Sequence, residues 1–277
     1  MLVSDFFPGD LFKNQTVFVT GGSSGINFAI AKTFASLGAN LAICARNQER
    51  LNEAAEKLCE TGAKVVARAV DVRDSEQMQV LLDEVGSELG PIKVLVCAAA
   101  GNFPCPAEKL SPNGFKSVVD IDLLGSFNAT HASFRQLKET RGSILFISAG
   151  MSYIPYFAQA HVGAAKAGVD NLMRNLALEW GRFGIRSNSI VPGPIEDTEG
   201  MNRLAPGKLG EKLKSMIPLQ RFGSKDEIAQ AAVFLSSPLA SYITGTSLIV
   251  DGGQNLPGSG LFSQVIAEGM GEREKAL

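Results

Sequence analysis

Hydrophobic positions along the chain fall into two kinds of run that alternate from one end to the other. Short runs rich in β-branched residues are typical of strands, and longer runs with apolar residues three or four positions apart are typical of helices. The first pair is the clearest: Thr16-Val-Phe-Val-Thr20 is strand-like, and Ile26, Ile30 and Phe34 share one face of the helix that follows. This alternation predicts βαβ units around a parallel sheet.

The whole pattern predicts an α/β fold: a single doubly wound Rossmann domain with a seven-stranded parallel sheet and helices on both faces. Strands are expected at 15–20, 40–45, 64–70, 92–98, 143–148, 186–191 and 246–250. Helices are expected at 25–37, 47–60, 75–89, 113–138, 161–181 and 225–236. No domain boundary interrupts the series, so we expect one domain over 1–277. Ligands of such sheets bind beyond the carboxyl ends of the strands, so functional residues should follow strands.

Composition and charge narrow the possible partners. With 277 residues, 45% of them hydrophobic, the chain can bury one substantial core. A formal net charge of −2 leaves no basic stripe, so we expect no nucleic-acid partner. No run reaches the roughly 18 apolar residues that a membrane span needs, so we expect no membrane partner.

Cysteine usage and the chain ends indicate a compartment. The four cysteines lack CxxC spacing, and Cys44 and Cys97 lie in strand-like runs, so we expect reduced, buried thiols and no metal site. The chain ends in Lys275-Ala276-Leu277, which falls short of the Ser-Lys-Leu peroxisomal signal. These features predict a cytoplasmic protein.

A glycine-rich turn joins the first strand to the first helix. Its glycines let the backbone approach a pyrophosphate closely, and the helix that begins near Gly25 points its positive end at that anion. An ordinary glycine turn is the alternative interpretation. The expected cofactor contacts here are Gly21, Ser23, Ser24, Gly25 and Ile26.

The end of the second strand indicates which dinucleotide binds. An NAD site would carry an acidic residue there, whereas this chain has Ala45 and then Arg46. A guanidinium can hold the 2′-phosphate of NADP(H), so NADP(H) is the predicted cofactor. Arg50, one turn further on, either reinforces the phosphate site or is a solvated helix residue.

The end of the third strand carries the pair Asp71-Val72. The carboxylate can accept a hydrogen bond from the adenine amino group, and the backbone that follows can flank the ring. Alternatively, Asp71 simply caps the helix that starts near Asp74.

These residues, taken together, resemble the short-chain dehydrogenase/reductase superfamily over nearly the whole chain. The motifs that match in order and spacing are Thr20-Gly-Gly-Ser-Ser-Gly25, Asp71, Ala98-Ala-Ala-Gly101, Lys166, Pro192-Gly-Pro194, Thr198 and Asp251-Gly-Gly253.

Within the superfamily, the chain is most similar to the 2,4-dienoyl-CoA reductases, especially the peroxisomal branch. That resemblance rests on Ala99-Ala-Gly-Asn-Phe103, Asp120-Ile-Asp122, His161 to Gly168, Pro192-Gly-Pro-Ile195 with Thr198-Glu-Gly200, and Ser237 to Tyr242. It implies an NADPH-dependent reductase of dienoyl-CoA thioesters in unsaturated fatty-acid β-oxidation, usually a homotetramer.

The resemblance also implies particular contacts. Lys166 would bind the nicotinamide ribose, and Asn102 and Phe103 would lie beside the nicotinamide and the substrate. Further cofactor contacts would come from Ala99, Ala100, Gly101, Pro192, Gly193, Ile195 and Thr198.

Departures from the superfamily are as informative as the matches. Where the usual site has Ser, Tyr and Asn, this chain has Ala149, Val162 and Asp122, and only Lys166 remains. Without the Tyr there is no phenol to protonate an alkoxide, so simple carbonyl reduction is disfavoured. Asn27, where a third glycine is common, makes a close approach of helix and cofactor less certain.

Conjugate reduction has different requirements, because a positioned water can return the proton to carbon. Asp122 and Lys166 are therefore the predicted catalytic residues, although an ion pair that only holds helices together is the alternative. His161 lies five residues before Lys166, which turns it off the lysine face and favours an indirect or interface role.

The remaining candidates surround the substrate. Tyr153 and Tyr156 are predicted to contact it, either as substitute acids or as apolar lining. The segment 196–218 carries Thr198, Arg203, Lys208, Lys212 and Lys214 among glycines and prolines, which suits a lid over an acyl-CoA substrate. The tail 254–277 is expected to be partly disordered or to lie on a neighbouring subunit.

Three hypotheses stay open at this point: a dienoyl-CoA reductase, a reductase of another activated alkene or carbonyl, and a catalytically silent NADP(H)-binding protein. A homotetramer is also predicted, because the helices over 113–138 and 161–181 have more apolar positions than one face needs, as at Leu172, Leu176 and Trp180.

Overall fold

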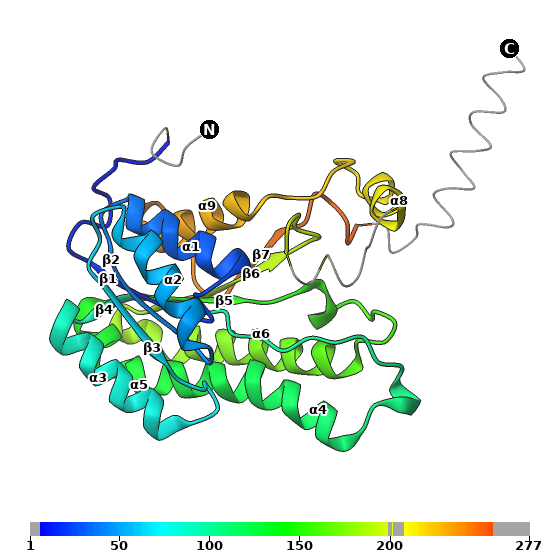
Figure 1. Ribbon diagram of the computed structural model, residues 1–277, viewed down its shortest axis with the longest axis horizontal. Helices are drawn as coiled ribbons and strands as arrows, with labels where there is room; N and C mark the ends of the chain where they lie inside the picture. Colours follow the sequence, from blue (N-terminus) through cyan, green and yellow to red (C-terminus); the bar gives the residue numbers. More distant parts are fainter. Residues whose placement is uncertain (1–5, 199–200, 202–207, 257–277) are drawn as a thin grey trace, which may run out of the picture.

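The computed structural model describes residues 6–198, 201 and 208–256, and its centre is one parallel sheet (Figure 1). The strands lie in the order β3-β2-β1-β4-β5-β6-β7. Their bounds are β1 Thr16–Thr20, β2 Asn40–Ala45, β3 Val65–Ala69, β4 Ile92–Cys97, β5 Ser143–Ile147, β6 Arg186–Pro192 and β7 Ser247–Val250. The seven predicted strands are confirmed, because every strand end lies within one residue of its expected position.

Helices cover both faces of the sheet, as predicted (Figure 1). One face is covered by α1 (Gly25–Ser36), α2 (Gln48–Cys59) and α9 (Lys225–Ser236). The other is covered by α3 (Ser75–Leu89), α5 (Gly125–Thr140) and α6 (Ala160–Trp180), with α4 (Pro112–Val119) beside α6. Alternation along β1 explains the two layers: Val17 and Val19 pack in the first, whereas Phe18 packs in the second.

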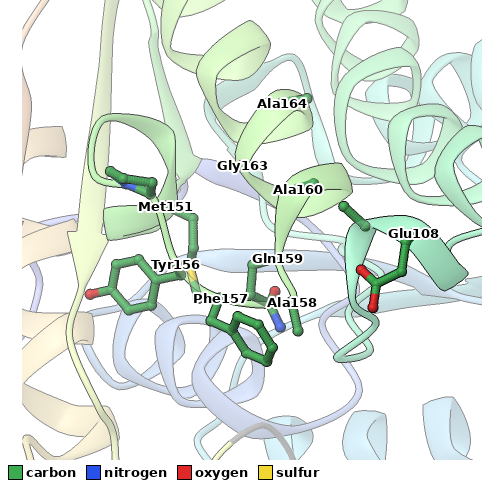
Figure 2. Close-up of a pocket in the computed structure, with 11 residues that line it drawn as sticks. Glu108, Met151, Tyr156, Phe157, Ala158, Gln159, Ala160, Gly163 and Ala164 are labelled. Carbon is green, nitrogen blue, oxygen red and sulfur yellow. The ribbon is translucent and has the colours of Figure 1, made fainter.

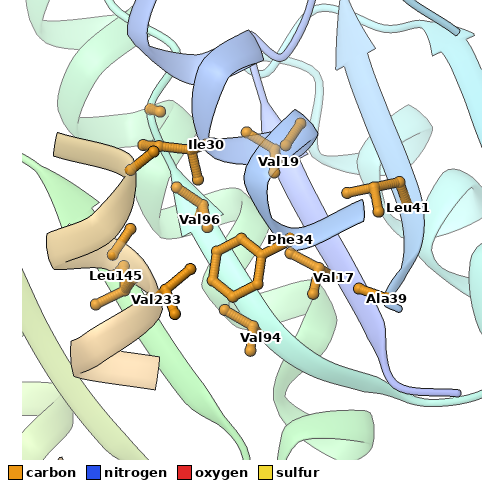
Figure 3. Packing of buried hydrophobic residues seen from close by; sticks show 14 of the residues in the cluster. Val17, Val19, Ile30, Phe34, Ala39, Leu41, Val94, Val96, Leu145 and Val233 are labelled. Carbon is orange, nitrogen blue, oxygen red and sulfur yellow. The ribbon is translucent and has the colours of Figure 1, made fainter. Parts of the chain in front are cut away.

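The layer under α1 is packed around Phe34, as Figure 3 shows. The Phe34 ring is fully buried and meets the Phe12 ring edge-on, with 4.8 Å between centroids. Val17, Val94 and Val233 come from three different elements and belong to the same buried cluster. This core fixes the glycine turn that precedes α1.

The helix expected over 113–138 is confirmed as an unbroken helical run over 112–140, but this run contains a π turn that was not predicted. A π turn over Asp120–Leu124 separates α4 from α5. A π turn adds a residue to the α-helical repeat, so hydrophobic spacing alone cannot locate it. Asp122 lies within this turn and is only 1% exposed.

Part of the expected lid is helical. The helix α8 (Lys208–Met216) lies within 196–218, where no helix was predicted, while 199–200 and 202–207 lie outside the described residues. The tail expected over 254–277 lies outside them from residue 257 onward.

The apolar residues that suggested a tetramer pack within their own subunit. Leu176 is buried, and Leu172 and Trp180 pack against the same core cluster. The argument from these three residues is therefore wrong. Other large apolar side chains on these helices are exposed, namely Phe127 at 46% and Leu178 at 82%.

The cysteines are free thiols at all four positions, which lie within the described residues. Cys44 and Cys97 are buried, as predicted, and burial raises the pKa of both thiols. Among the described helices, none has the length and apolar character needed to cross a membrane.

Candidate active site

The glycine turn after β1 needs its glycines for different reasons. Gly21 has a φ of +70°, and a Cβ there would lie 2.9 Å from Asn27 Nδ2 and 3.1 Å from Ala99 Cα. A Cβ on Gly22 would lie 2.7 Å from Ile43 Cγ2. At Gly25, with a φ of +60°, no described atom lies within 4 Å of that position. The turn is thus tightly packed against neighbouring residues at Gly21 and Gly22, whereas the space beside Gly25 is open.

The start of α1 has the character of an anion site. Ser24 is the N-cap residue, its side chain makes no capping bond to a described residue, and the first turn holds no acidic residue. Neither the cap side chain nor the first turn of α1 therefore neutralises the positive end of the helix. Ser23, Gly25 and Ile26 surround this point, and the arrangement fits the pyrophosphate of a dinucleotide.

Asn27 has a positive role that the sequence analysis missed. Its Nδ2 donates to the carbonyl oxygens of Gly21 at 3.3 Å and Ala98 at 2.9 Å. The Thr20 hydroxyl oxygen accepts from the N–H groups of Ala98 and Ala99 at 2.9 and 3.0 Å. Together these bonds join the glycine turn to the segment after β4.

The adenosine end of the expected site carries three charged side chains. Arg46 is exposed just beyond β2. Asp71 accepts from the Arg73 guanidinium, with Nη2 at 2.6 Å and Nε at 3.0 Å, and this contact is the main reason that the pKa of Asp71 is lowered. Arg46 adds a smaller effect in the same direction. The sequence analysis did not anticipate Arg73, which follows Val72 and holds the Asp71 carboxylate in place.

Helix capping near the adenosine site involves other residues. Asp74, not Asp71, is the N-cap of α3 and accepts from the Gln77 N–H at 2.9 Å, so the capping alternative for Asp71 is wrong. Arg50 is in the first turn of α2, where its N–H donates to the capping residue Asn47.

Asp122 and Lys166 form a buried ion pair at the centre of the site. Lys166 Nζ lies 3.1 Å from Asp122 Oδ2, and the two side chains are 8% and 0% exposed. Lys166 Nζ also donates to the Ile147 carbonyl at 2.9 Å, and Asp122 Oδ1 accepts from the Gly101 N–H at 2.7 Å. This network joins the ends of β4 and β5 to the π turn and α6.

The positions that usually supply hydroxyl groups carry none here. Ala149 follows β5, and Val162 is buried against Val118 and Ala165. Neither Ala149 nor Val162 can donate a proton. Lys166 and Asp122 form the buried ion pair of this region, and their catalytic role stays a prediction.

Tyr153 and Tyr156 are tied to the end of the described chain. The Tyr156 hydroxyl donates to Asn255 Oδ1 at 2.7 Å and accepts from Gln254, while Asn255 Nδ2 donates to the Tyr153 hydroxyl at 3.2 Å. Asp251 holds that segment by accepting from the Asn255 N–H. Burial raises the pKa of both phenols, which makes them weaker acids.

The rings of Phe103 and His161 are in contact and tilted by 48° to each other. Their ring centroids are 4.5 Å apart, with Phe103 37% exposed and His161 fully buried. Because His161 is fully buried in its own subunit, the interface role is disfavoured, and the indirect role stays a prediction. Asn102 is exposed next to Phe103.

The segment after β6 is anchored at its base. A Cβ on Gly193 would lie 2.6 Å from Asp251 Cα, Ile195 is 3% exposed, and the Thr198 hydroxyl donates to the Ile195 carbonyl at 2.8 Å. Pro192 closes β6 itself.

The structure places the cationic residues of the expected lid in different surroundings. Arg203 and the side chain of Lys208 lie outside the described residues. Lys214 pairs with Glu211 at 2.8 Å and lies over the Phe222 ring, so its charge already has a partner, whereas Lys212 is exposed.

The residues predicted to contact the cofactor lie near the carboxyl ends of neighbouring strands, as expected. The strands β1, β4, β5 and β6 are neighbours in the sheet. The glycine turn follows β1, the segment Ala99 to Gly101 follows β4, and the segment Pro192 to Ile195 lies at the end of β6. The Lys166–Asp122 pair is bonded to the ends of β5 and β4. Val72 packs in the core, and its carbonyl accepts from Asn128 at 2.9 Å, which fixes the chain beyond β3.

Comparison with known proteins decides the family. A family model described as enoyl-(acyl carrier protein) reductase matches residues 21–255. A short-chain dehydrogenase from Bacillus anthracis is 38% identical and superposes with a TM-score of 0.84, covering 90% of this chain and 99% of the other. The chain belongs to the short-chain dehydrogenase/reductase family. It is therefore an oxidoreductase that uses a nicotinamide cofactor.

Two further relatives of this reductase bear on its site. The peroxisomal 2,4-dienoyl-CoA reductase, (3E)-enoyl-CoA-producing, of Saccharomyces cerevisiae is 50% identical over 248 residues, which cover 88% of this chain and 85% of the relative. An NADPH-bound short-chain oxidoreductase of Pseudomonas aeruginosa PAO1, whose title describes an atypical catalytic centre, is 30% identical with a TM-score of 0.82. The alignment covers 87% of this chain and 97% of that one.

Proposed function

We propose that this protein is an NADPH-dependent 2,4-dienoyl-CoA reductase. The observation that carries the proposal is the buried Asp122–Lys166 ion pair in a reductase site where Ala149 and Val162 replace the usual hydroxyl donors. A site of this kind lacks the acid for an alkoxide but retains charged groups suited to conjugate reduction. The 50% identity to the yeast peroxisomal 2,4-dienoyl-CoA reductase supports the same substrate class.

The cofactor assignment rests on the residues of the turn and of β2. Gly21, Ser24 and Gly25 form an open, uncapped helix start that suits a pyrophosphate. Arg46 would bind the 2′-phosphate, which selects NADPH, and Asp71 would accept from the adenine amino group. When bound, NADPH supplies the hydride that adds to the δ carbon of the dienoyl chain.

Side chains of the protein would then stabilise the negative charge on the substrate and direct the proton to carbon. Lys166 would bind the nicotinamide ribose, and its positive charge favours the negative charge that spreads toward the thioester oxygen. Asp122 is fixed by Gly101 and Lys166 and would orient a water that returns a proton to carbon. Protonation at the α carbon leaves the double bond between the β and γ carbons, which matches the product in the name of the yeast relative.

Assembly and location are further parts of the proposal. Exposed Phe127 and Leu178 on α5 and α6 provide apolar surface for a homotetramer. The sequence favours the cytoplasm, whereas the yeast relative is named peroxisomal. A tagged protein viewed beside a peroxisomal marker distinguishes the two compartments.

The direct test is NADPH oxidation with a panel of thioesters. We expect turnover with 2,4-hexadienoyl-CoA and little with acetoacetyl-CoA or simple ketones. Faster reduction of the ketones would favour a carbonyl reductase, and no turnover with any substrate despite NADPH binding would favour a silent cofactor-binding protein.

A further inference from the structure

The chain that follows β3 packs directly on the π turn that carries Asp122. Val72 is 6% exposed, and a Cβ on Gly125 would lie 2.5 Å from its Cγ2 and 2.9 Å from its Cβ. The Gly125 N–H closes the π turn, because it donates to the carbonyl of Asp120. Val72 therefore rests on the residue where the turn ends, with no room between them for another carbon atom.

Asn128 makes a second connection between the two segments. It lies one turn after Gly125 in α5, is 7% exposed, and its Nδ2 donates to the carbonyls of Val72 at 2.9 Å and Arg73 at 3.2 Å. These carbonyls belong to the backbone that would flank the adenine ring of the cofactor. A shift of this backbone would break both bonds unless the start of α5 moved with it.

Charged side chains connect the same two segments at the surface. The pKa of Arg73 is raised mainly by its hydrogen bond with Asp71, and the charge of Asp120 adds a smaller effect in the same direction. Asp120 is the first residue of the π turn and pairs with Lys116. Arg73 thus lies within electrostatic reach of both the adenosine site and the turn.

Lys166, the other half of the ion pair, is held on a different side. It comes from α6, whose first turns border a cavity of about 440 Å³ (Figure 2). The described residues that line this cavity belong to 107–108, the loop before α6 and the helix itself, and none comes from the segment 71–73. The direct contacts of the segment 71–73 therefore lead to Asp122 rather than to Lys166.

The position of Asp122 depends on the turn around it. Its carbonyl accepts from the Ser126 hydroxyl at 2.6 Å, and its Oδ1 accepts from the Gly101 N–H at 2.7 Å. A group that orients a water for proton transfer must be placed accurately, because a misplacement of about 1 Å can cost roughly 10²-fold in rate. A small displacement of Gly125, three residues later, is therefore enough to change turnover.

We propose that Val72 and Asn128 are positioning residues that couple the adenosine end of the cofactor site to Asp122. When a 2′-phosphoadenosine group is bound, it holds the segment 71–73, and through these contacts it holds the π turn where Asp122 can act. The proposal rests on the proposed function, because it takes Asp122 as the group that orients the water.

A divided cofactor tests the coupling. Reduced nicotinamide mononucleotide carries the hydride but lacks adenosine, and adenosine 2′-monophosphate supplies only the adenosine end. At saturating mononucleotide, adding adenosine 2′-monophosphate should raise kcat on 2,4-hexadienoyl-CoA by about fivefold or more. In an enzyme that turns over with NADPH, an unchanged or lowered kcat would overturn the proposal.

Asn128→Ala removes one of the two connections, and α5 offers a matched control. Gln136 lies about two turns later, is also buried, and its amide donates to the Leu82 carbonyl at 2.7 Å and accepts from the Ile92 N–H at 3.0 Å. Asn128→Ala should lose most of the activation, whereas Gln136→Ala, which costs the helix a similar buried amide, should keep it. Equal losses in both variants would indicate a merely structural role and contradict the proposal.

A second pair of variants covers the case in which Asn128→Ala does not fold. Val72→Ala removes the methyl groups that lie against Gly125, and Val70→Ala makes the same change in the same core cluster, two residues earlier. Only Val72→Ala should reduce the activation by adenosine 2′-monophosphate. Equal activation in these two variants would count against the coupling.

Hydrogen exchange measured with adenosine 2′-monophosphate alone separates this proposal from the proposed function. In the wild-type protein, the ligand at saturation should slow amide exchange over 119–128 by about threefold or more, and should leave exchange in α9, on the opposite face of the sheet, unchanged. That result upholds the coupling even if no dienoyl thioester is reduced. Equal slowing in both segments, or no slowing over 119–128, refutes it even if the reductase activity is present.

Discussion

Replacing Asp122 by Asn tests the proposed proton route with little change of shape. The amide oxygen can still accept from the Gly101 N–H, which lies 2.7 Å from Oδ1. The amide NH₂ then faces the Lys166 ammonium, where Oδ2 now lies at 3.1 Å, so two donors meet and the ion pair is lost. Breaking a buried pair from one side costs about 3–5 kcal/mol, with less expected for an isosteric change.

The expected result is a folded enzyme that turns over slowly. We expect kcat on 2,4-hexadienoyl-CoA to fall by at least about 10²-fold, the usual scale of general acid–base assistance. The NADPH dissociation constant should stay within about threefold, and the melting temperature should drop by a few degrees. Asp122→Ala is less informative, because it also leaves the Gly101 N–H unpaired.

A matched control is available two residues away. Asp120 pairs with Lys116 at the surface of the same π turn, so Asp120→Asn makes the same chemical change in a weak, exposed ion pair. It should leave kcat unchanged. Full turnover in Asp122→Asn, or equal losses in both variants, would refute the reasoning.

Further predictions concern cofactor, acid and assembly. Wild-type enzyme should bind NADPH at least about tenfold more tightly than NADH, and Arg46→Ala should remove most of this preference in fluorescence titrations. Tyr156→Phe should keep most of the wild-type kcat. Because burial raises the pKa of the Tyr156 phenol, the pH profile of the wild-type enzyme should show no tyrosine ionisation below about pH 10. Asn27→Ala should weaken NADPH binding by several-fold through the loss of two bonds to Gly21 and Ala98, as measured by calorimetry. Light scattering at micromolar concentration should give a homotetramer, and a monomer there would count against the apolar surface at Phe127.

The sheet could be predicted because its inner strands are buried on both faces and its helices are amphipathic. A run such as Thr16–Thr20 can hardly be anything but a strand, because the turn at Gly21 and the helical spacing after Gly25 follow it directly. The π turn over Asp120–Leu124 could not be predicted, because a π turn leaves no local sign in the hydrophobic spacing.

The site was predictable to the extent that its residues follow strands. Asp122 and Lys166 were placed by resemblance, and the ion pair that the sequence analysis raised for them is present in the structure. The role of Asn27 was missed because its bond to Ala98 joins residues 71 positions apart.

Isotope transfer tests the central claim most directly. The enzyme would reduce 2,4-hexadienoyl-CoA with NADPH deuterated at the transferred position, and then with unlabelled NADPH in D₂O, and the product carbons would be examined by NMR. We predict cofactor deuterium at the δ carbon and solvent deuterium at the α carbon of a 3-enoyl thioester. Cofactor deuterium at the carbonyl carbon, or its appearance in an alcohol formed from a ketone while the diene stays unreduced, would contradict the account.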